Sequence, residues 1–334
     1  VMSNAWFGPA KEFDDVEFVG LVDINEAAAI SRKEEHGFDS AVTGTDLKAV
    51  IEQTNADVVF DVTIPEAHHQ VTLTALNNDC HILGEKPMAD SMAHAREMVA
   101  ASKANDKLYA VIQNRRYTKD IIAFRDLVQA GTVGDLHTVN ADFYIGAHFS
   151  TKRGKRDFRD SMEHVLLLDM AIHSFDQARF IVQKDPVSVY CHEWNPNGSW
   201  YDRDASANCI FEMSDGTVFN YRGSWCSEGL NTTWECDWRV IGTGGSAKWD
   251  GGNEMAAQCV KSSDGFFSEM DDVTIAERSD IEHAAHAGLI RDFIDAVKGG
   301  ATPQTHCTDN IKSLAMVFGA IESAETGTKV SIEI

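Results

Sequence analysis

Ile82-Leu83-Gly84-Glu85-Lys86-Pro87-Met88 is an apolar run that ends in Glu-Lys-Pro. The pattern predicts a buried β-strand that stops at Pro87, because proline has no N–H to donate to a sheet ladder. Lys86 would then stand at the carboxyl end of a strand, where open α/β sheets bind their ligands. A turn with a solvated lysine beside a stiffening proline explains these few residues equally well, so the rest of the chain has to decide between the two.

Residues 1–117 alternate between short apolar runs and amphipathic runs. The run at 56–63 is almost continuously apolar, which is typical of a strand with both faces covered. Strands separated by helical segments of roughly 10–15 residues indicate a parallel, doubly wound sheet. We expect strands at 18–23, 56–63, from Ile82 onward and at 108–113, and helices at 1–11, 27–36, 46–53, 66–78 and 91–105.

An acid, Asp23, closes the first of these expected strands. Helix, strand and terminal acid form the second half of a mononucleotide-binding unit, in which this carboxylate takes the ribose hydroxyls of adenosine. We expect the first strand of that unit and its Gly-rich turn to belong before Val1, since neither occurs in this sequence. Asp23 alone is weak evidence, because aspartates often form turns after strands.

The pattern changes after residue 117. Residues 136–145 alternate between apolar and polar side chains, which indicates a strand with two unlike faces. Further β-rich runs follow without intervening helices and with hairpin-type turns at 214–216 and 242–245, so we expect a large, mostly antiparallel open sheet. We expect strands at 136–145, 187–193, 208–213, 217–225, 234–242, 246–249 and 329–334, and helices at 118–130, 163–182, 282–298 and 309–326.

Such a broad sheet leaves one face to be covered. A second subunit would cover it economically, so we expect a homodimer or homotetramer that forms through this sheet. The tryptophans of this region are expected in the sheet core or an interface rather than as sugar platforms. The two late helices should pack back on the first domain. The tryptophans are Trp194, Trp200, Trp225, Trp234, Trp238 and Trp249.

The expected helix at 163–182 carries Asp169 and His173, which are four residues apart and therefore share one face. An aspartate one turn before a histidine can accept the imidazole N–H and raise its basicity, which is how a general base for an alcohol proton is built. Asp176, a further turn along, could orient the same face. An exposed ion pair, worth roughly 0.2–0.5 kcal/mol, is a simpler explanation of the same spacing.

A metal site is the other alternative for Asp169 and His173. It would need a third and a fourth ligand at recognisable spacing. His164 lies on the wrong face of the helix, and His283 and His286 sit in an Ala-rich segment. We therefore expect no metal here.

Arginines mark two further candidate positions. Arg115 and Arg116 follow the strand at 108–113 and could hold substrate hydroxyls or a carboxylate, or could equally be a surface pair. The loop at 152–157 is the one basic cluster in an acidic chain and includes Arg156. Such a run is usually just solvated, but its nearness to the helix at 163–182 allows a substrate-lid role.

The composition excludes several classes of function. The formal net charge of −23 over 334 residues argues against nucleic acid or an anionic membrane as a partner. There is no run of about 18 apolar residues that would span a membrane, and we expect no secretory signal. The seven cysteines are scattered without a Cys-x-x-Cys pair, so we expect reduced thiols in a cytoplasmic protein.

Together these residues resemble the Gfo/Idh/MocA oxidoreductases, a family named for glucose–fructose oxidoreductase, inositol dehydrogenase and a rhizopine-catabolism protein. The resemblance spans residues 2–330 and rests on Glu85-Lys86-Pro87 together with Asp169-Met170-Ala171-Ile172-His173, in this order and at this separation. It implies a Rossmann-type dinucleotide-binding domain at 1–117 and an α/β domain at 118–334 that binds substrate and forms oligomers. It also implies an NAD(P)-dependent enzyme that oxidises or reduces a sugar, polyol or related small molecule.

The resemblance also implies roles for individual residues. Lys86 would orient the substrate hydroxyl and the nicotinamide ribose, His173 would take the hydroxyl proton, and Asp169 would position one or the other. Asp23 favours NAD over NADP, because its charge repels a 2′-phosphate. The family's Gly-x-Gly-x-x-Gly turn would end around Met2, with Ser3 in the third-glycine place. The implied cofactor residues are Met2, Ser3, Asp23, Ile24, Asn25, Thr63, Ile64, Pro65, His68, Glu85, Lys86 and Asn114, and the implied substrate residues are Arg116, Arg156, Asp169 and His173.

Two other functions fit the same residues. Some relatives of this fold hydrolyse glycosides through a transient oxidation by bound NAD, and these redox-neutral enzymes do not release NADH. A non-catalytic binding protein that keeps the fold and has lost the cofactor is the third possibility. The Gly-rich turn that is not in the sequence favours it, and Lys86, Asp169 and His173 oppose it.

Overall fold

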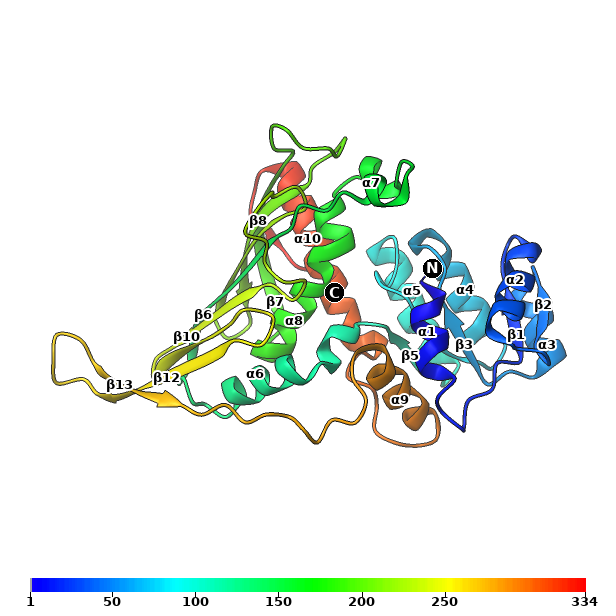
Figure 1. The fold of residues 1–334 in the computed structure, drawn as a ribbon, viewed down its shortest axis with the longest axis horizontal. Coiled ribbons are helices and arrows are strands. Elements are labelled where there is room, and N and C mark those ends of the chain that lie inside the picture. The colour runs from blue at the N-terminus through cyan, green and yellow to red at the C-terminus, as the bar shows by residue number, and fades with distance from the viewer. Residues whose placement is uncertain (1) are drawn as a thin grey trace. The chain divides into compact units, whose positions relative to one another are not determined.

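The computed structural model describes residues 2–334, so Val1, the first residue of the expected N-terminal helix, lies outside the described residues. The chain divides into two compact units. The first unit holds the residues up to Tyr117 together with Glu282–Ile311, and the second holds Thr118–Ile281 together with Lys312–Ile334. Figure 1 shows their helices and strands.

The first unit has the predicted alternation of strands and helices. Its strands form two parallel sheets, β1-β2 and β3-β4-β5. The short strand β2 was not expected from the sequence. The elements are α1 (Ser3–Ala10), β1 (Gly20–Val22), α2 (Glu26–His36), β2 (Val42–Gly44), α3 (Leu47–Thr54), β3 (Val58–Asp61), α4 (Pro65–Leu76), β4 (His81–Gly84), α5 (Met92–Ala104), β5 (Tyr109–Val111), the 3-10 turn η1 (Asn114–Tyr117) and α9 (Ala285–Val297).

Local side chains define where these helices begin and end. The side chains of Asn25, Asp46 and Ser91 each accept a backbone N–H at the start of α2, α3 and α5. Helix α2 ends at Gly37, whose φ of 68° is in the left-handed region that glycine adopts most readily. The central strand β4 is buried on both faces, as its apolar sequence predicts.

The boundary of the first unit differs from a single break after residue 117. Helix α9 belongs to this unit because Leu289, Ile290 and Phe293 pack in one core with Trp6 and Ile112. Most of α10 (Cys307–Thr326) belongs instead to the second unit, where its apolar face joins the core of the large sheet. Of the two late helices, α9 thus belongs to the first unit and most of α10 to the second.

The second unit is built on a nine-stranded sheet in the order β13-β12-β11-β10-β6-β9-β8-β7-β14. All neighbours are antiparallel except β6 and β9, so the sheet is mixed. Strands β12 and β13 were not expected. The elements, besides α10, are α6 (Lys119–Gln129), β6 (Leu136–Tyr144), α7 (Phe149–Arg153), the 3-10 turn η2 (Phe158–Ser161), the π-helix η3 (Leu166–Ala171), α8 (Ile172–Val182), β7 (Pro186–Trp194), β8 (Ser206–Met213), β9 (Val218–Ser224), β10 (Asp237–Gly242), β11 (Gly245–Trp249), β12 (Met255–Ser262), β13 (Glu269–Val273) and β14 (Val330–Ser331).

Helices cover one face of this sheet (Figure 1). Phe175 of α8 packs edge-on against Phe211 and Tyr221 of the sheet, at ring-centroid distances of 4.8 and 5.3 Å. Three of the tryptophans, Trp225, Trp238 and Trp249, are only 2% exposed, as expected for core residues, whereas Trp234 is 49% exposed.

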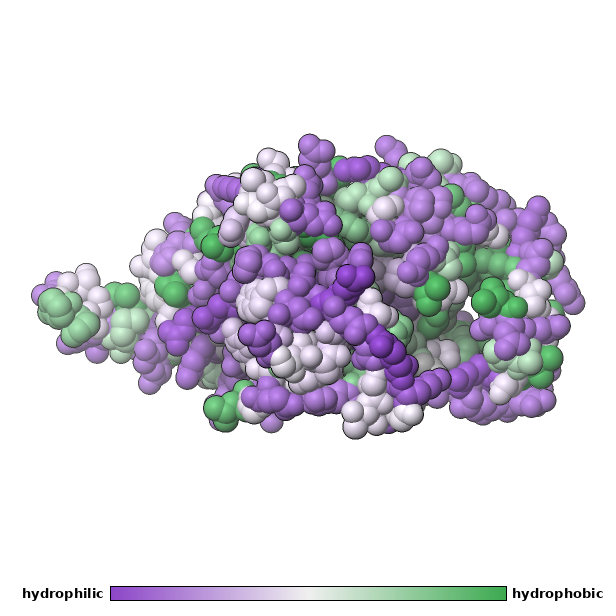
Figure 2. All heavy atoms as spheres, turned by 90° about the horizontal axis from the view of Figure 1, so that it is seen from above, coloured by the Kyte–Doolittle hydropathy of each residue, from purple (hydrophilic) through white to green (hydrophobic). Residues whose placement is uncertain are grey.

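Hydrophilic residues cover most of the face seen in Figure 2. The hairpin between β12 and β13 lies at the left of both views, and its tip carries the exposed residues Phe266 and Phe267. None of the helices in residues 2–334 is both long and apolar enough to span a membrane.

Candidate active site

Lys86 stands just beyond the carboxyl end of the buried strand β4, which ends at Gly84. Its neighbour Glu85 is 6% exposed and is held inside the unit. Trp6 Nε1–H donates to Glu85 Oε1 over 2.8 Å, and the backbone N–H of Lys86 donates to Glu85 Oε2 over 3.1 Å. The end of β4 and the carboxylate of Glu85 thus together fix the backbone at Lys86.

A buried acid organises the end of the neighbouring strand β3. The carboxylate of Asp61 accepts the backbone N–H and the hydroxyl of Thr63, over 3.0 and 2.6 Å. On its other oxygen it meets Nδ1 of His68 at 2.8 Å, and His68 is only 1% exposed. Two of the predicted cofactor residues, Thr63 and His68, are therefore brought together by Asp61, which sequence reasoning had treated only as part of a strand.

The residues after β1 lie on the surface of the unit. Asp23 is exposed, and its Oδ1 accepts the backbone N–H of Asn25 over 2.8 Å. Asn25 in turn caps α2 through Ala27 N–H. Ile24 between them is 99% exposed.

These residues fit a dinucleotide. Among the described residues, the caps Met2 of α1 and Ile64 of α4 make no side-chain hydrogen bond. In α4, Pro65 has no N–H and the N–H of Ala67 donates to the carbonyl of Ile64 over 2.9 Å, so the N–H of Glu66 is the donor that the first turn of α4 would offer to a phosphate oxygen. Ser3 and Pro65 are the first residues of these helices. Asp23 offers the carboxylate that an adenosine ribose needs.

Asn114 and Arg116 lie in the turn η1 after β5. Arg116 is 5% exposed, and its guanidinium lies 2.9 Å from the carboxylate of Asp309 and donates to the carbonyl of Gln304 over 3.1 Å. The guanidinium of Arg116 thus ties η1 to α10 and to the segment before it. The substrate-binding role of Arg116 stays a prediction.

In the second unit, Asp169 lies on the π-helix η3 and His173 on α8, which continues it. The carboxylate of Asp169 accepts two N–H groups of Arg159, from Nε to Oδ2 over 2.6 Å and from Nη2 to Oδ1 over 3.2 Å. Two parallel bonds of this kind fix a carboxylate in orientation as well as in place. The hydrogen bond between Asp169 and His173 stays a prediction.

Arg159 is itself held firmly. Its guanidinium lies over the rings of Phe149 and Phe158, 4.6 and 4.4 Å from their centroids. It also donates to the buried carboxylate of Asp157 over 3.3 Å. Burial, the largest single influence, lowers the pKa of Arg159, but the hydrogen bonds and charges of Asp169 and Asp157 together outweigh it, so the pKa of Arg159 is raised. Sequence reasoning missed this residue, which follows the basic loop at 152–157 in the turn η2.

Other contacts fix the helix that carries His173, which is 8% exposed. Ser313 of α10 donates to Asp176 over 2.7 Å and accepts from Arg179 over 2.9 Å. Arg156, by contrast, is largely exposed and pairs with Asp202. Asp176 is thus part of the packing between α8 and α10, and Arg156 stays a candidate for contact with substrate.

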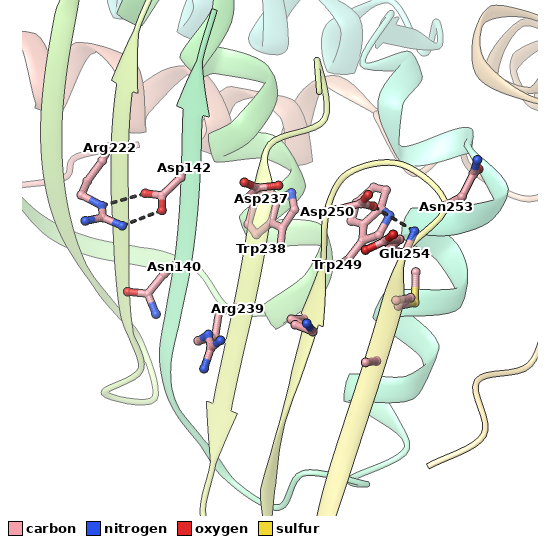
Figure 3. Close-up of a pocket in the computed structure, with 13 residues that line it drawn as sticks. Asn140, Asp142, Arg222, Asp237, Trp238, Arg239, Trp249, Asp250, Asn253 and Glu254 are labelled. Carbon is pink, nitrogen blue, oxygen red and sulfur yellow. Dashed lines mark hydrogen bonds and ion pairs between the residues drawn. The ribbon is translucent and has the colours of Figure 1, made fainter. Parts of the chain in front are cut away.

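Within residues 2–334 no group of three or more histidines, cysteines, aspartates or glutamates is placed to hold a metal ion. A hollow of about 620 Å³ lies on the outer face of the large sheet, and neither Asp169 nor His173 lines it. Figure 3 shows its side chains, among them Arg222, which binds Asp142 with two hydrogen bonds of 2.7 and 2.5 Å. Burial and the neighbouring Asp142 and Asp250 raise the pKa of Asp237 there. Its charges largely neutralise one another, and we assign it no role.

Known proteins share this sequence pattern and fold. The 1,5-anhydro-D-fructose reductase of Ensifer adhaerens is 24% identical over 325 residues, which cover 95% of this chain and 91% of that protein. The D-glucoside 3-dehydrogenase of Escherichia coli K12 is 24% identical over 332 residues, covering 96% and 91%. An oxidoreductase from Agrobacterium radiobacter, solved in complex with NAD+, L-tartaric acid and magnesium, has the same fold, with a TM-score of 0.84 and 19% identity over 99% of this chain and 95% of that one.

Two family profiles match consecutive parts of the chain. Residues 4–113 match the oxidoreductase family with an NAD-binding Rossmann fold. Residues 121–248 match the GFO/IDH/MocA C-terminal domain. The chain therefore belongs to the Gfo/Idh/MocA family of NAD-binding oxidoreductases.

Proposed function

We propose that this enzyme transfers hydride between a hydroxyl-bearing carbon of a sugar or polyol and NAD, with Lys86, Asp169 and His173 as its catalytic residues. The observation that carries the proposal is the pair of hydrogen bonds from Arg159 to Asp169, because they orient a carboxylate one helical turn before a buried histidine. The first unit would bind the cofactor and the second the substrate. The relatives that act on an anhydrofructose and on glucosides support this substrate class.

Each residue has a distinct task in the proposed reaction. His173 removes the proton of the substrate hydroxyl as a general base. Asp169, oriented by the two hydrogen bonds from Arg159, stabilises the positive charge that develops on the imidazole or orients the hydroxyl. The ammonium of Lys86 donates to the substrate oxygen and to the nicotinamide ribose. Bound NAD would supply the hydride acceptor, held by Asp23, by Thr63 and by the starts of α1 and α4.

The experiment that tests this function measures nicotinamide turnover with the purified protein. We expect NADH to be consumed with 1,5-anhydro-D-fructose, or to form from NAD with methyl β-D-glucoside or myo-inositol. Release of glucose from the glucoside without net NADH would support the redox-neutral hydrolase instead. A folded protein that binds neither NAD nor NADH in a fluorescence titration would support the non-catalytic binding protein.

The cofactor preference depends on Asp23. Replacing Asp23 with alanine should lower the preference for NAD over NADP about tenfold, because one charged hydrogen bond to the ribose is lost together with a repulsion of the 2′-phosphate. The measurement is kcat/KM for both cofactors. Asp14→Ala, a nearby exposed acid outside the proposed site, is the matched control. An unchanged ratio in Asp23→Ala would show that Asp23 does not meet the ribose.

We also propose that two or four copies assemble through the outer face of the large sheet. Tyr190 and Ile210 are 43% and 52% exposed and lie directly opposite each other on β7 and β8. Ile210→Glu should therefore lower the molar mass measured by light scattering toward that of a monomer. Phe266→Ser at the hairpin tip is the control, and a change of mass in this variant alone would move the contact to the hairpin.

The charge and the thiols of the chain indicate the cellular compartment that we propose for it. All seven cysteines are free thiols, which is typical of the reducing cytoplasm. The net charge of −23 disfavours nucleic acid and anionic membranes as partners. We therefore keep a cytoplasmic location as a proposal, which cell fractionation would test.

A further inference from the structure

The helix that carries Asp169 starts from a turn in an unusual conformation. His164, two residues before η3, has a φ of 51°, in the left-handed region that non-glycine residues rarely occupy. Its carbonyl accepts the N–H of Leu168 over 2.9 Å, so this residue makes the first hydrogen bond of the helical segment. A left-handed histidine persists only when its surroundings hold it there.

Two acids from different elements hold the side chain of His164. Nδ1 lies 2.5 Å from Oε2 of Glu193 on β7, whose side chain is only 2% exposed. Nε2 lies 3.7 Å from Oε1 of Glu325 in the last turn of α10. The imidazole therefore connects the start of the helical segment to the sheet on one side and to α10 on the other.

The charges around this pair favour a protonated imidazole. The hydrogen bond to Glu193 raises the pKa of His164 despite burial, and Glu325 and Glu163 act in the same direction. Burial raises the pKa of Glu193, and Asp204 and Glu325 add to this effect. Because the pKa values of both His164 and Glu193 are raised, the pair binds a proton more tightly in the folded protein than in the unfolded chain. We assign that proton to His164, because an imidazolium and an ionised carboxylate then pair as opposite charges and neither charge is buried without a partner.

We propose that His164 is a positioning residue whose ion pair with Glu193 holds the left-handed turn and so sets the helix that presents Asp169 and His173. The inference rests on the proposed function, in which these two residues do the chemistry. Arg159 fixes the carboxylate of Asp169 directly, whereas His164 fixes the backbone on which Asp169 stands. A glycine would adopt the same left-handed backbone without strain. What the histidine adds at this position is its side chain, which makes the contacts to Glu193 and Glu325.

The pair also makes the helix sensitive to pH. Because the pKa of His164 is raised by folding, its stabilising contribution is fully present below the unfolded value of 6.5 and is lost as the pH rises through the folded value. Above that pH, Glu193 keeps a buried charge without its cation. The other charged groups around the pair are Glu163, which pairs with Arg203 at 3.9 Å, and Asp204. Glu163 and Arg203 are exposed and screened by water, and the half-buried Asp204 is an acid, so none of these groups replaces the imidazolium.

Hydrogen exchange measured by mass spectrometry on the whole protein tests this role. His164→Asn and His164→Gly both accept a left-handed backbone, and Glu193→Gln keeps the shape of the glutamate. We expect the amides of residues 166–173 to exchange about tenfold faster in all three variants, as for the loss of one charge-assisted hydrogen bond. His192→Asn, an exposed histidine on the same strand as Glu193, should leave the exchange unchanged.

Turnover separates positioning from general stability. With 1,5-anhydro-D-fructose and NADH we expect kcat to fall about tenfold in Glu193→Gln, with NADH affinity unchanged, as for one lost charged contact. The alkaline fall of kcat should move to lower pH in Glu193→Gln and disappear in His164→Asn. Exchange and kcat that match wild type would overturn the inference, and so would faster exchange with unchanged kcat. If wild type turns over none of the test substrates, the proposed function fails, while hydrogen exchange still decides whether His164 holds the helix.

Discussion

Replacing His173 with alanine should lower kcat by about 10²–10⁴-fold, which is the contribution of a positioned general base. The affinity for NAD should stay nearly unchanged, because His173 belongs to the second unit and the proposed NAD residues belong to the first. The loss should be larger near neutral pH than at alkaline pH, where hydroxide in the solvent replaces part of the missing base. The measurements are steady-state kcat at several pH values and a fluorescence titration with NADH.

Two further variants keep this result interpretable. His173→Asn fills more of the buried space than alanine, so its kcat reports the lost base with less disturbance of packing. His137→Asn, an exposed histidine on β6, should behave as wild type. If His173→Ala lost turnover and NADH binding to the same extent, together with a lower melting temperature, His173 would be a structural residue.

Most of the fold could be predicted from the sequence, because the buried face of a helix or strand repeats its apolar residues at the period of that element. Strand β4 was predictable because an apolar run that ends at a proline fits a buried strand whose hydrogen-bond ladder stops at that proline. Helix α2 was predictable from the helical pattern at 27–36, and it ends at Gly37 in the left-handed conformation that glycine adopts readily. Strand β13 was not predictable. Its residues are mostly exposed acids at the edge of the sheet, which lack the apolar alternation of a half-buried strand.

The candidate site was less predictable, because its important contacts join residues that no periodicity relates. Asp169 and His173 were identified from their spacing. The π-helix that contains Asp169 could not be predicted, because the spacing of apolar residues does not indicate it. Arg159 was not predicted, because nothing in its sequence position indicates that its guanidinium lies over the rings of Phe149 and Phe158. The ion pair of Arg116 with Asp309 was likewise not predictable, because the two residues lie far apart in the chain.

Lys86 has the second largest expected effect, and its surroundings explain why. The residue before it, Glu85, is held by Trp6 and also accepts the backbone N–H of Lys86, so the start of the side chain has little freedom. An ammonium that is held in place needs little reorganisation when charge develops on the substrate oxygen. This pre-organisation is lost when the side chain is shortened.

Lys86→Ala should therefore lower kcat by about 10²–10³-fold, as for the loss of one donor to a developing negative charge. It should also weaken NADH binding, since Lys86 is proposed to contact the nicotinamide ribose, and this separates it from His173→Ala. Lys86→Arg keeps the charge and should retain part of the activity, whereas Lys107→Ala, which removes a lysine of the same unit that pairs with Asp79, should match wild type. Kinetics and NADH fluorescence measure both effects. A fully active Lys86→Ala enzyme would remove Lys86 from the catalytic set and leave His173 and Asp169 as the residues that act on the hydroxyl.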